Sequence, residues 1–330
     1  MREAVAGIGG RCYGAATNTF MSKRVVLLFA GQGAQSVGMG RELAESFPVV
    51  RGMLSEADGI LGMGLSDVMF GGPMEELTRT SRCQPALYVH GLACLAVLRE
   101  AVPGLQVGAA AGLSLGEFTA HAAAGTFSFA DGLRLVARRG EFMEAACEAT
   151  EGTMLAMLGG EEEAVRALAA DADVDLANFN TPGQIVLSGS RENIAKAVAL
   201  AKERGLRGKE LPVAGAYHSR LMAGAQARLA TELAATAIGD PSFPVVCNLE
   251  ARPVSGADDI RRTLENQVTG SVRWAQSMEY LLGEGFDCFL ELGPGGQLAG
   301  MLGRIRKGTE VHSISDPASL EKAVAALGAG

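Results

Sequence analysis

The sequence predicts an α/β protein, in which a mainly parallel sheet covered by helices is interrupted by a smaller α+β unit. Three observations support this. Short apolar runs alternate with helix-like stretches along most of the chain, residues from about 149 to 212 follow a β-α-β-β-α-β order, and a glycine-flanked serine lies between a strand and a helix. With 330 residues, the chain can form two domains, or one domain with an insertion.

The first half of the chain supplies the start of the predicted main layer. Its run Val25 to Ala30 is apolar and β-branched, as in a buried strand, and it ends in the loop Gly31-Gln32-Gly33. The segment 84–98 is apolar nearly all round, which predicts a core helix. The other elements expected here are helices over 41–59, 117–124 and 128–147 and a strand over 107–111. Strands that alternate with helices in this way indicate a parallel sheet covered on both faces.

The expected order of strands and helices changes after about residue 151. The expected order is a strand over 153–159, a helix over 161–170, strands over 173–180 and 184–188, a helix over 191–204 and a strand over 208–213. This is the order of the split, ferredoxin-like unit. The main layer then resumes with a helix over 220–237 and strands over 244–248 and 288–292.

Composition excludes several classes of protein. Hydrophobic residues make up 48% and charged residues 20%, as in a folded enzyme, and the formal charge of −8 argues against nucleic-acid binding. No apolar run approaches the roughly 20 residues that a membrane span needs. The six cysteines are scattered and form no C-x-x-C pair, so we expect buried free thiols in a reducing compartment, and neither a zinc site nor a redox motif.

Residues 1–24 differ from the rest because they are rich in Ala and Gly, mildly basic, and lack the apolar region of a secretory signal. One interpretation is an artefact of start-codon choice, since Met21 directly precedes the first strand. The other is an organelle transit peptide over residues 1–20. The first is favoured and predicts a flexible extension on a cytoplasmic protein; the second would place the protein in the plastid stroma.

The pentapeptide Gly112-Leu113-Ser114-Leu115-Gly116 carries the clearest chemical signal. A strand, a sharp turn with serine at its apex and a following helix are the context of a nucleophile elbow. Glycines two residues either side of the serine avoid collision with the neighbouring strand and helix, and the helix N-terminus stabilises negative charge. The alternative interpretation is a Gly-Ser turn without chemistry.

Such a serine needs a general base, and the chain has only four histidines. His90 lies in the predicted core helix, His121 starts on the order of 10 Å along the helix from Ser114, and His312 lies in a short run near the C-terminus. His218 ends a strand and opens a helix, which places it at the functional edge of an α/β sheet. We therefore predict that His218 is the base.

Seven blocks of the sequence, in order, resemble one family. They are LFAGQGAQSVGMG, GLSLGEFTAHAAAG, RRGEFM, NFNTPGQIVLSG, VAGAYHSRLM, NQVTGSVRW and ELGPGGQLAGML, and they span about residues 25–315. The chain is identified on these blocks as similar to the malonyl-CoA:acyl carrier protein transacylases. The resemblance implies an α/β-hydrolase-like large domain over 25–148 and 213–316, an inserted ferredoxin-like domain over 149–212, and a C-terminal helix or tail over 317–330.

The resemblance also implies roles. Ser114 would take the malonyl group from CoA, His218 would be the base, and the backbone N–H groups of Gln32 and Leu115 would form the oxyanion hole. Arg139 would pair with the malonyl carboxylate through its planar guanidinium, although from the sequence alone a surface helix arginine is the better interpretation. The remaining implied positions are Gln267, whose backbone carbonyl would orient the base, and the pocket residues Leu113, Tyr217 and Asn180.

Two pocket positions bear on the substrate. Leu113 stands where the commoner form of the family has histidine, which removes a donor but neither nucleophile nor base, so we expect transacylase activity to be retained with altered carboxylate contacts. Tyr217 is bulky, as in members that take malonyl rather than methylmalonyl, but one methyl group is worth only about 1–3 kcal/mol of discrimination. The sequence leaves open whether the product enters fatty-acid or polyketide synthesis.

The expected partners are malonyl-CoA and acyl carrier protein, with no cofactor, no metal, no nucleic acid and no membrane, and the expected state is a monomer. Because acyl carrier protein is acidic, the enzyme needs a local basic surface, and Lys202, Arg204, Arg207 and Lys209 cluster on the small domain. A solvated helix end is the alternative explanation of this cluster. Two other functions stay open: a serine hydrolase, which would need a carboxylate partner for His218, and a non-catalytic carrier-protein scaffold.

Overall fold

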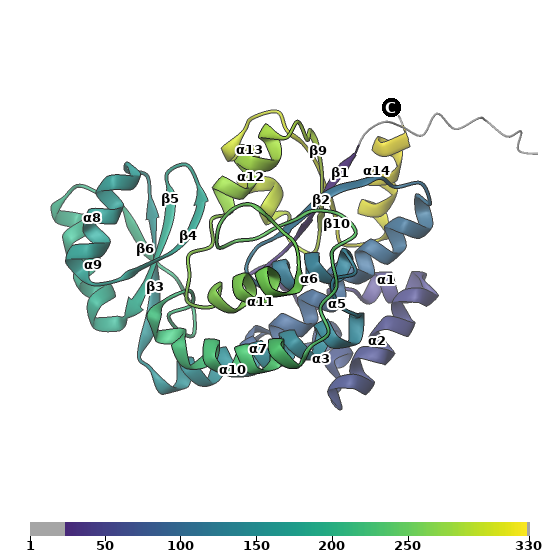
Figure 1. The fold of residues 1–330 in the computed structure, drawn as a ribbon, viewed down its shortest axis with the longest axis horizontal. Helices are drawn as coiled ribbons and strands as arrows, with labels where there is room; N and C mark the ends of the chain where they lie inside the picture. The colour runs from purple at the N-terminus through teal and green to yellow at the C-terminus, as the bar shows by residue number, and fades with distance from the viewer. Residues whose placement is uncertain (1–23, 329–330) are drawn as a thin grey trace, which may run out of the picture.

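The computed structural model describes residues 24–328 (Figure 1). The predicted N-terminal extension therefore lies outside the described residues, apart from Arg24, and so does Cys12. The other five cysteines are buried, as the sequence predicts, and none of them forms a disulfide within residues 24–328. Among the described residues, no helix combines the length and the apolar character needed to cross a membrane.

The larger sheet has six strands in the order β10-β9-β1-β2-β7-β8. All neighbouring pairs are parallel except β7 and β8. The strands are β1 (Val25–Phe29), β2 (Val107–Gly112), β7 (Val245–Val246), β8 (Pro253–Val254), β9 (Cys288–Leu292) and β10 (Glu310–Ile314). This confirms the predicted mainly parallel sheet.

Alternate residues of the central strand reach opposite faces of this sheet. Val25, Leu27 and Phe29 belong to a core cluster with the long helices α5 (Thr80–Ala101) and α7 (Phe129–Ala149). Val26 and Leu28 belong to a second cluster with α12 (Trp274–Gly283) and α13 (Gln297–Ile305). Because both faces are covered, β1 is a continuous apolar run without polar alternation, which is why the sequence identifies it.

Further helices complete the larger layer. Around the face of α5 and α7 lie α1 (Arg41–Ser46), α2 (Pro48–Leu61), α3 (Leu65–Gly71), α4 (Met74–Thr78), α6 (Leu115–Ala123), α10 (Ala223–Ala235), α11 (Ala257–Asn266) and α14 (Pro317–Gly328). The 3₁₀ turn η1 (Arg220–Met222) precedes α10. The helix predicted over 41–59 is in fact two helices, because Phe47 is extended and Pro48 starts a new one.

The second sheet is antiparallel, with the order β4-β5-β3-β6. Its strands and helices follow the predicted β-α-β-β-α-β order: β3 (Gly152–Leu158), α8 (Glu162–Ala172), β4 (Asp175–Thr181), β5 (Gln184–Ser190), α9 (Arg191–Glu203) and β6 (Gly208–Glu210). Figure 1 shows α8 and α9 on the side of this sheet away from the larger layer. The two helices and the sheet enclose a separate apolar core.

Several elements were not predicted from the sequence. Strand β10 is half-buried along most of its length because it lies at the edge of the larger sheet, so it has no apolar run to mark it. Strand β8 has only two residues. Helix α11 buries only Ile260, Thr263 and Leu264, and its other positions are largely polar. Helices α3, α4, α12 and α13 were also missed.

Candidate active site

Ser114 lies at the sharp turn between β2 and α6. Its φ of 53° is in the left-handed region, an uncommon conformation for a residue with a side chain. The flanking glycines are sterically required: a Cβ on Gly112 would lie 1.9 Å from the backbone of Gly116, and a Cβ on Gly116 would lie 2.1 Å from the carbonyl oxygen of Phe29. The turn therefore has the predicted geometry of a nucleophile elbow.

His218 lies beside this serine. Its Nε2 is 2.8 Å from Ser114 Oγ, and its Nδ1 is 2.9 Å from the carbonyl oxygen of Gln267. Since a carbonyl can only accept, Nδ1 carries a proton and Nε2 is free to accept the serine hydrogen. Burial, with a contribution from the positive Arg139, lowers the pKa of His218 to about 4, so the ring is neutral at pH 7 and able to act as a base.

The other three histidines are not at this site. His90 and His121 are buried, and burial lowers their pKa values to about 4 and about 3. His121 contacts Thr126, with 3.1 Å between Nδ1 and Oγ1, and His312 contacts Glu310 on β10. The structure thus brings together Ser114 and the histidine that the sequence favours.

Arg139 is buried, with 1% of its surface exposed, so the interpretation as a surface arginine is wrong. Its Nη2 donates to Ser114 Oγ at 3.1 Å and to Gln267 Oε1 at 2.9 Å, while Nη1 donates to Gln84 Oε1 at 2.8 Å. Burial lowers the pKa of Arg139 to about 10, which leaves the guanidinium charged at neutral pH. A permanent cation therefore contacts the oxygen of the candidate nucleophile.

The loop after β1 passes directly against the elbow. A Cβ on Gly31 would lie 2.4 Å from the carbonyl oxygen of Leu113, so only glycine allows this close approach. The approach brings Gln32 to the same cleft as Ser114, together with Leu115, the first residue of α6. These are the two residues expected to supply the oxyanion hole.

The cleft has a volume of about 420 Å³, and residues from both the larger layer and the second sheet line it. Ser114, His218, Arg139, Gln32, Leu113 and Leu115 come from the larger layer, and Met154, Asn178, Asn180 and Val186 from the smaller one. Tyr217 also lines the cleft, and its hydroxyl is 2.7 Å from Thr80 Oγ1. Asn180 is at the wall, where its Oδ1 is buried without a hydrogen-bond partner.

Two further residues hold the elbow, and neither was predicted from the sequence. Asn248, which follows β7, accepts from the Ser114 backbone N–H at 2.7 Å and donates to the Gly112 carbonyl at 2.8 Å. Glu117, on α6, accepts from the Asn248 backbone N–H at 2.9 Å and from Gln267 Nε2 at 2.7 Å. The position of Asn248 at the end of a predicted strand was the available signal, since such strand ends gather at one edge of the sheet.

Comparison with known proteins agrees with this geometry. Residues 26–319 match the family described as "Acyl transferase domain". The chain is 40% identical over 313 residues to a malonyl CoA-acyl carrier protein transacylase of Bacillus subtilis (strain 168), which covers 93% of this chain and 98% of the relative. The chain belongs to the malonyl CoA-acyl carrier protein transacylase family. The resemblance seen in the seven sequence blocks is therefore confirmed.

Solved structures of this transacylase family have the same fold. The acyl-carrier-protein S-malonyltransferase of Bartonella henselae is 36% identical, with a TM-score of 0.88, and the match covers 92% of this chain and 99% of that one. A malonyl-transacylase in complex with its type II PKS acyl-carrier protein gives a match 35% identical, with a TM-score of 0.89, covering 92% of this chain and all of that one.

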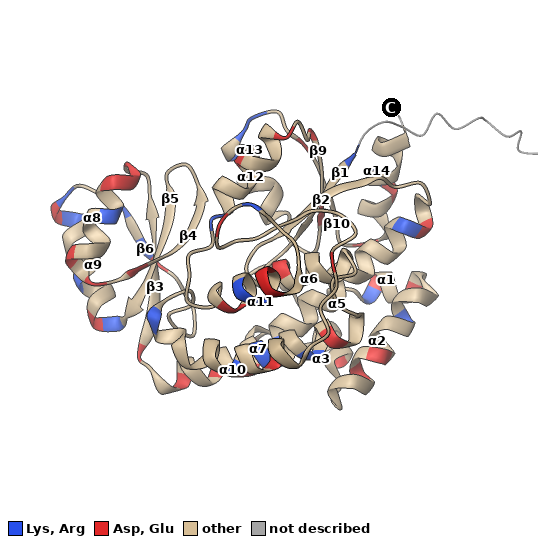
Figure 2. Ribbon diagram, viewed as in Figure 1, with Lys and Arg blue, Asp and Glu red and all other residues tan. Residues whose placement is uncertain are grey.

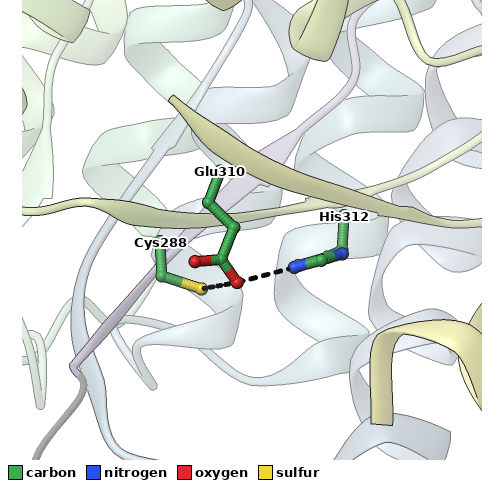
Figure 3. Close-up of side chains that lie close together, drawn as sticks. All are labelled: Cys288, Glu310 and His312. Carbon is green, nitrogen blue, oxygen red and sulfur yellow. Dashed lines mark hydrogen bonds and ion pairs between the residues drawn. The ribbon is translucent and has the colours of Figure 1, made fainter. Parts of the chain in front are cut away.

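One group of metal-ligand side chains occurs within residues 24–328 of this transacylase family member. Cys288, Glu310 and His312 lie on β9 and β10 with their ligand atoms within 4.8 Å of one another (Figure 3). His312 Nε2 is 2.9 Å from Glu310 Oε1, and Cys288 Sγ is 3.9 Å from the same oxygen, so Glu310 joins the other two side chains. The group lies at the start of β9, whereas the cleft lies where the parallel strands end.

Proposed function

We propose that this enzyme transfers the malonyl group of malonyl-CoA to the phosphopantetheine thiol of acyl carrier protein through a malonyl-serine intermediate. The observation that carries the proposal is the double contact of Ser114 Oγ, with the neutral base His218 on one side and the buried cation Arg139 on the other. A nucleophile and a carboxylate-binding cation in one cleft suit an acyl group that ends in a carboxylate.

In the first half-reaction, His218 Nε2 takes the proton of Ser114 Oγ as this oxygen attacks the thioester carbonyl carbon. The backbone N–H groups of Gln32 and Leu115 stabilise the oxyanion of the tetrahedral intermediate. When the carbon–sulfur bond breaks, the proton on His218 passes to the departing CoA sulfur. The malonyl group is left as an ester on Ser114, with its free carboxylate held by Arg139.

The second half-reaction runs the same steps in reverse with a different thiol. His218 takes the proton of the phosphopantetheine sulfur, which attacks the malonyl ester carbonyl. The ester bond to Ser114 breaks and the proton returns from His218 to Ser114 Oγ. Neither half-reaction changes an oxidation state, so the proposed reaction needs no oxidant or reductant.

The partner of His218 distinguishes this proposal from a serine hydrolase. A hydrolase would be expected to place a carboxylate beside His218 Nδ1, but the partner there is the neutral carbonyl of Gln267. The nearby buried carboxylate, Glu117, bonds to Gln267 and Asn248 instead. This arrangement supports Gln267 in the base-orienting role. The scaffold alternative gives no reason for the joint presence of Ser114, His218 and Arg139.

Arg139→Ala is expected to lower kcat/KM for malonyl-CoA about a hundredfold, because removing a buried partner of a carboxylate costs about 3 kcal/mol. Steady-state kinetics with malonyl-CoA and acetyl-CoA measure the effect, and the preference for malonyl over acetyl should largely disappear. Arg138→Ala is the matched control, since the neighbouring Arg138 is exposed and pairs with Glu141 and Glu232. An Arg139→Ala enzyme that keeps its malonyl preference would remove Arg139 from the carboxylate-binding role.

The basic cluster on the small domain is proposed as part of the carrier-protein surface. Figure 2 shows acidic and basic residues interspersed on α8 and α9, and Arg204 is paired with Asp171. Arg207 and Lys209 are exposed and lie within four residues of the cleft-lining Leu211. These two are therefore the better candidates to attract an acidic partner.

Reversing both charges, as Arg207→Glu with Lys209→Glu, should raise the KM for acyl carrier protein several-fold and leave the KM for malonyl-CoA unchanged. The effect should shrink at high salt because screening weakens exposed charge pairs. The double reversal Lys307→Glu with Lys322→Glu, at two exposed lysines outside the small domain, controls for the same change in net charge. An equal rise in both KM values would contradict the docking role.

We propose the fold type, the domain limits, the oligomeric state and the cellular location together with the function. The antiparallel order β4-β5-β3-β6 supports a ferredoxin-like insert over 149–212, and the elbow at Ser114 supports an α/β-hydrolase-like domain over 25–148 and 213–316. A monomer in the cytoplasm stays the expectation, and the bacterial source of the relatives named above favours it over the plastid. The malonyl group is expected to supply fatty-acid chain elongation.

Intact-protein mass after brief incubation with malonyl-CoA tests the function. We expect an added malonyl group that persists until acyl carrier protein is supplied and is then discharged to it. Steady release of CoA without an adduct would indicate a hydrolase. No adduct and no release of CoA would indicate a scaffold, and either result would overturn the proposal.

A further inference from the structure

Glu117 is a fully buried carboxylate in the first turn of α6, three residues after Ser114. Its Oε2 accepts two hydrogen bonds, from Gln267 Nε2 at 2.7 Å and from the Asn248 backbone N–H at 2.9 Å. Its Oε1 is buried without a hydrogen-bond partner. A carboxylate in such a place is costly to bury, and the proposed reaction assigns it no step.

The two partners of Glu117 are the residues that hold the reacting groups. Gln267 accepts from His218 through its backbone carbonyl, accepts from Arg139 through Oε1, and donates to the Ser114 carbonyl at 2.9 Å through Nε2. Asn248 accepts from the Ser114 backbone N–H. Ser114, His218 and Arg139 therefore each bond to a residue that itself bonds to Glu117 Oε2.

We propose that Glu117 is a positioning residue for malonyl transfer, fixing Gln267 and Asn248 through one carboxylate oxygen and so aligning Ser114, His218 and Arg139. The inference rests on the proposed function and adds a residue to its machinery. Glu117 touches neither the nucleophilic oxygen nor the base, so its effect is transmitted through its two partners.

The side-chain amide of Gln267 shows why this anchor matters. Its oxygen faces the donor Arg139 and its nitrogen faces the acceptors Glu117 and Ser114 O. A flipped amide would set N–H against N–H at Arg139 and oxygen against oxygen at Glu117, so the charges of Arg139 and Glu117 select one orientation. If Glu117 is uncharged, Arg139 is the one remaining charge that selects the orientation of the Gln267 amide.

The charged and titratable groups around Glu117 are few. Arg139 faces it from α7, Cys247 lies next to Asn248 after β7, and His121 is one turn along α6 and neutral. Strands β1 and β2 carry no titratable residue, and α5 meets α6 at Thr119, on another face of the helix. Burial raises the pKa of Glu117 to about 7, although its two hydrogen bonds and Arg139 act in the opposite direction. Its charge therefore changes within the working pH range of an enzyme.

The test compares wild type, Glu117→Gln and Glu117→Leu by the single-turnover rate of Ser114 acylation from pH 5 to 9. Glutamine keeps an acceptor but loses the charge, so we expect about a tenfold lower rate at pH 8, the difference between a charged and a neutral hydrogen bond. Leucine removes the acceptor and should lower the rate more than a hundredfold. The malonyl-CoA concentration at half-maximal rate should change less than twofold in Glu117→Gln, because Arg139 keeps its charge.

The pH profile separates positioning from a merely structural role. Below the pKa of Glu117, protonation makes the wild type resemble Glu117→Gln, so the wild-type rate should fall by the same tenfold step near pH 7. Glu117→Gln should lack the step, and neither profile should show the titration of His218, whose pKa is about 4. Glu291→Gln is the matched control: Glu291 is equally buried but caps α13 through the Leu298 and Ala299 N–H groups, so this variant should lose stability and keep the step.

Two results would overturn the inference while leaving the proposed function intact. One is a Glu117→Gln enzyme with the wild-type rate and profile. The other is a lower acylation rate in Glu117→Gln together with a wild-type pH profile that shows no step near pH 7. A wild-type enzyme that forms no malonyl-serine at any pH would instead overturn the proposed function, and this inference with it.

Discussion

Ser114→Ala is expected to abolish malonyl uptake and to lower transfer to acyl carrier protein by about 10⁴-fold or more, the range found when a serine nucleophile is removed. The variant lacks the oxygen that both His218 and Arg139 contact, so neither base nor cation has a group to act on. Intact-protein mass should show no adduct after incubation with malonyl-CoA, and the transfer assay should give only the background rate.

The fold should survive this substitution. Alanine at φ 53° suffers the same backbone strain as serine, and the steric demands at Gly112 and Gly116 are unchanged. Thermal unfolding checks this. Ser190→Ala is a suitable control, because Ser190 caps α9 on the second sheet and its loss costs about 1 kcal/mol of stability without touching the cleft. A malonyl adduct that persists in Ser114→Ala would place the nucleophile elsewhere.

His218→Ala is expected to lower both half-reactions by about 10³- to 10⁴-fold, since each begins with transfer of a proton to Nε2. The wild-type ring should remain a competent base down to low pH. Its folded pKa of about 4 lies below the ordinary value, so the neutral, active form persists until the pH falls toward 4. Rates of acylation and of discharge, measured separately, should fall together.

The control for this variant is His312→Ala, which removes a histidine that pairs with Glu310 on an edge strand. It should leave both half-reactions unchanged. If His218→Ala acylated normally and failed only in discharge, the single-base scheme would be wrong.

The sequence was most informative where one residue type is scarce or one motif is sterically constrained. The elbow around Ser114 needs glycine at two fixed positions, and His218 had only three competitors. Arg139 is different, because it lies next to the exposed Arg138 on the same helix, and nothing in the local pattern reveals which of the two faces the core. The family resemblance, rather than periodicity, singled it out.

Glu117 and Asn248 illustrate what local patterns cannot predict. Their contacts join residues 131 positions apart, and they depend on the pairing of β2 with β7 in the larger sheet. A strand order is not encoded in any short segment, so the partners of a buried polar side chain become apparent only once the sheet is assembled. Strand β10 was missed because it lies at the edge of the sheet, where its half-buried side chains form no continuous apolar run.

The cleft lies between the larger layer and the small sheet, and this has an evolutionary consequence. The proposed reacting groups lie on the larger layer, whereas Met154 and Val186 reach the cleft from the small sheet. Mutations in that opposite wall can reshape the space for an acyl chain without disturbing the alignment of Ser114 and His218. Substrate range can therefore diverge between descendants of one ancestral enzyme while the chemical step is inherited unchanged.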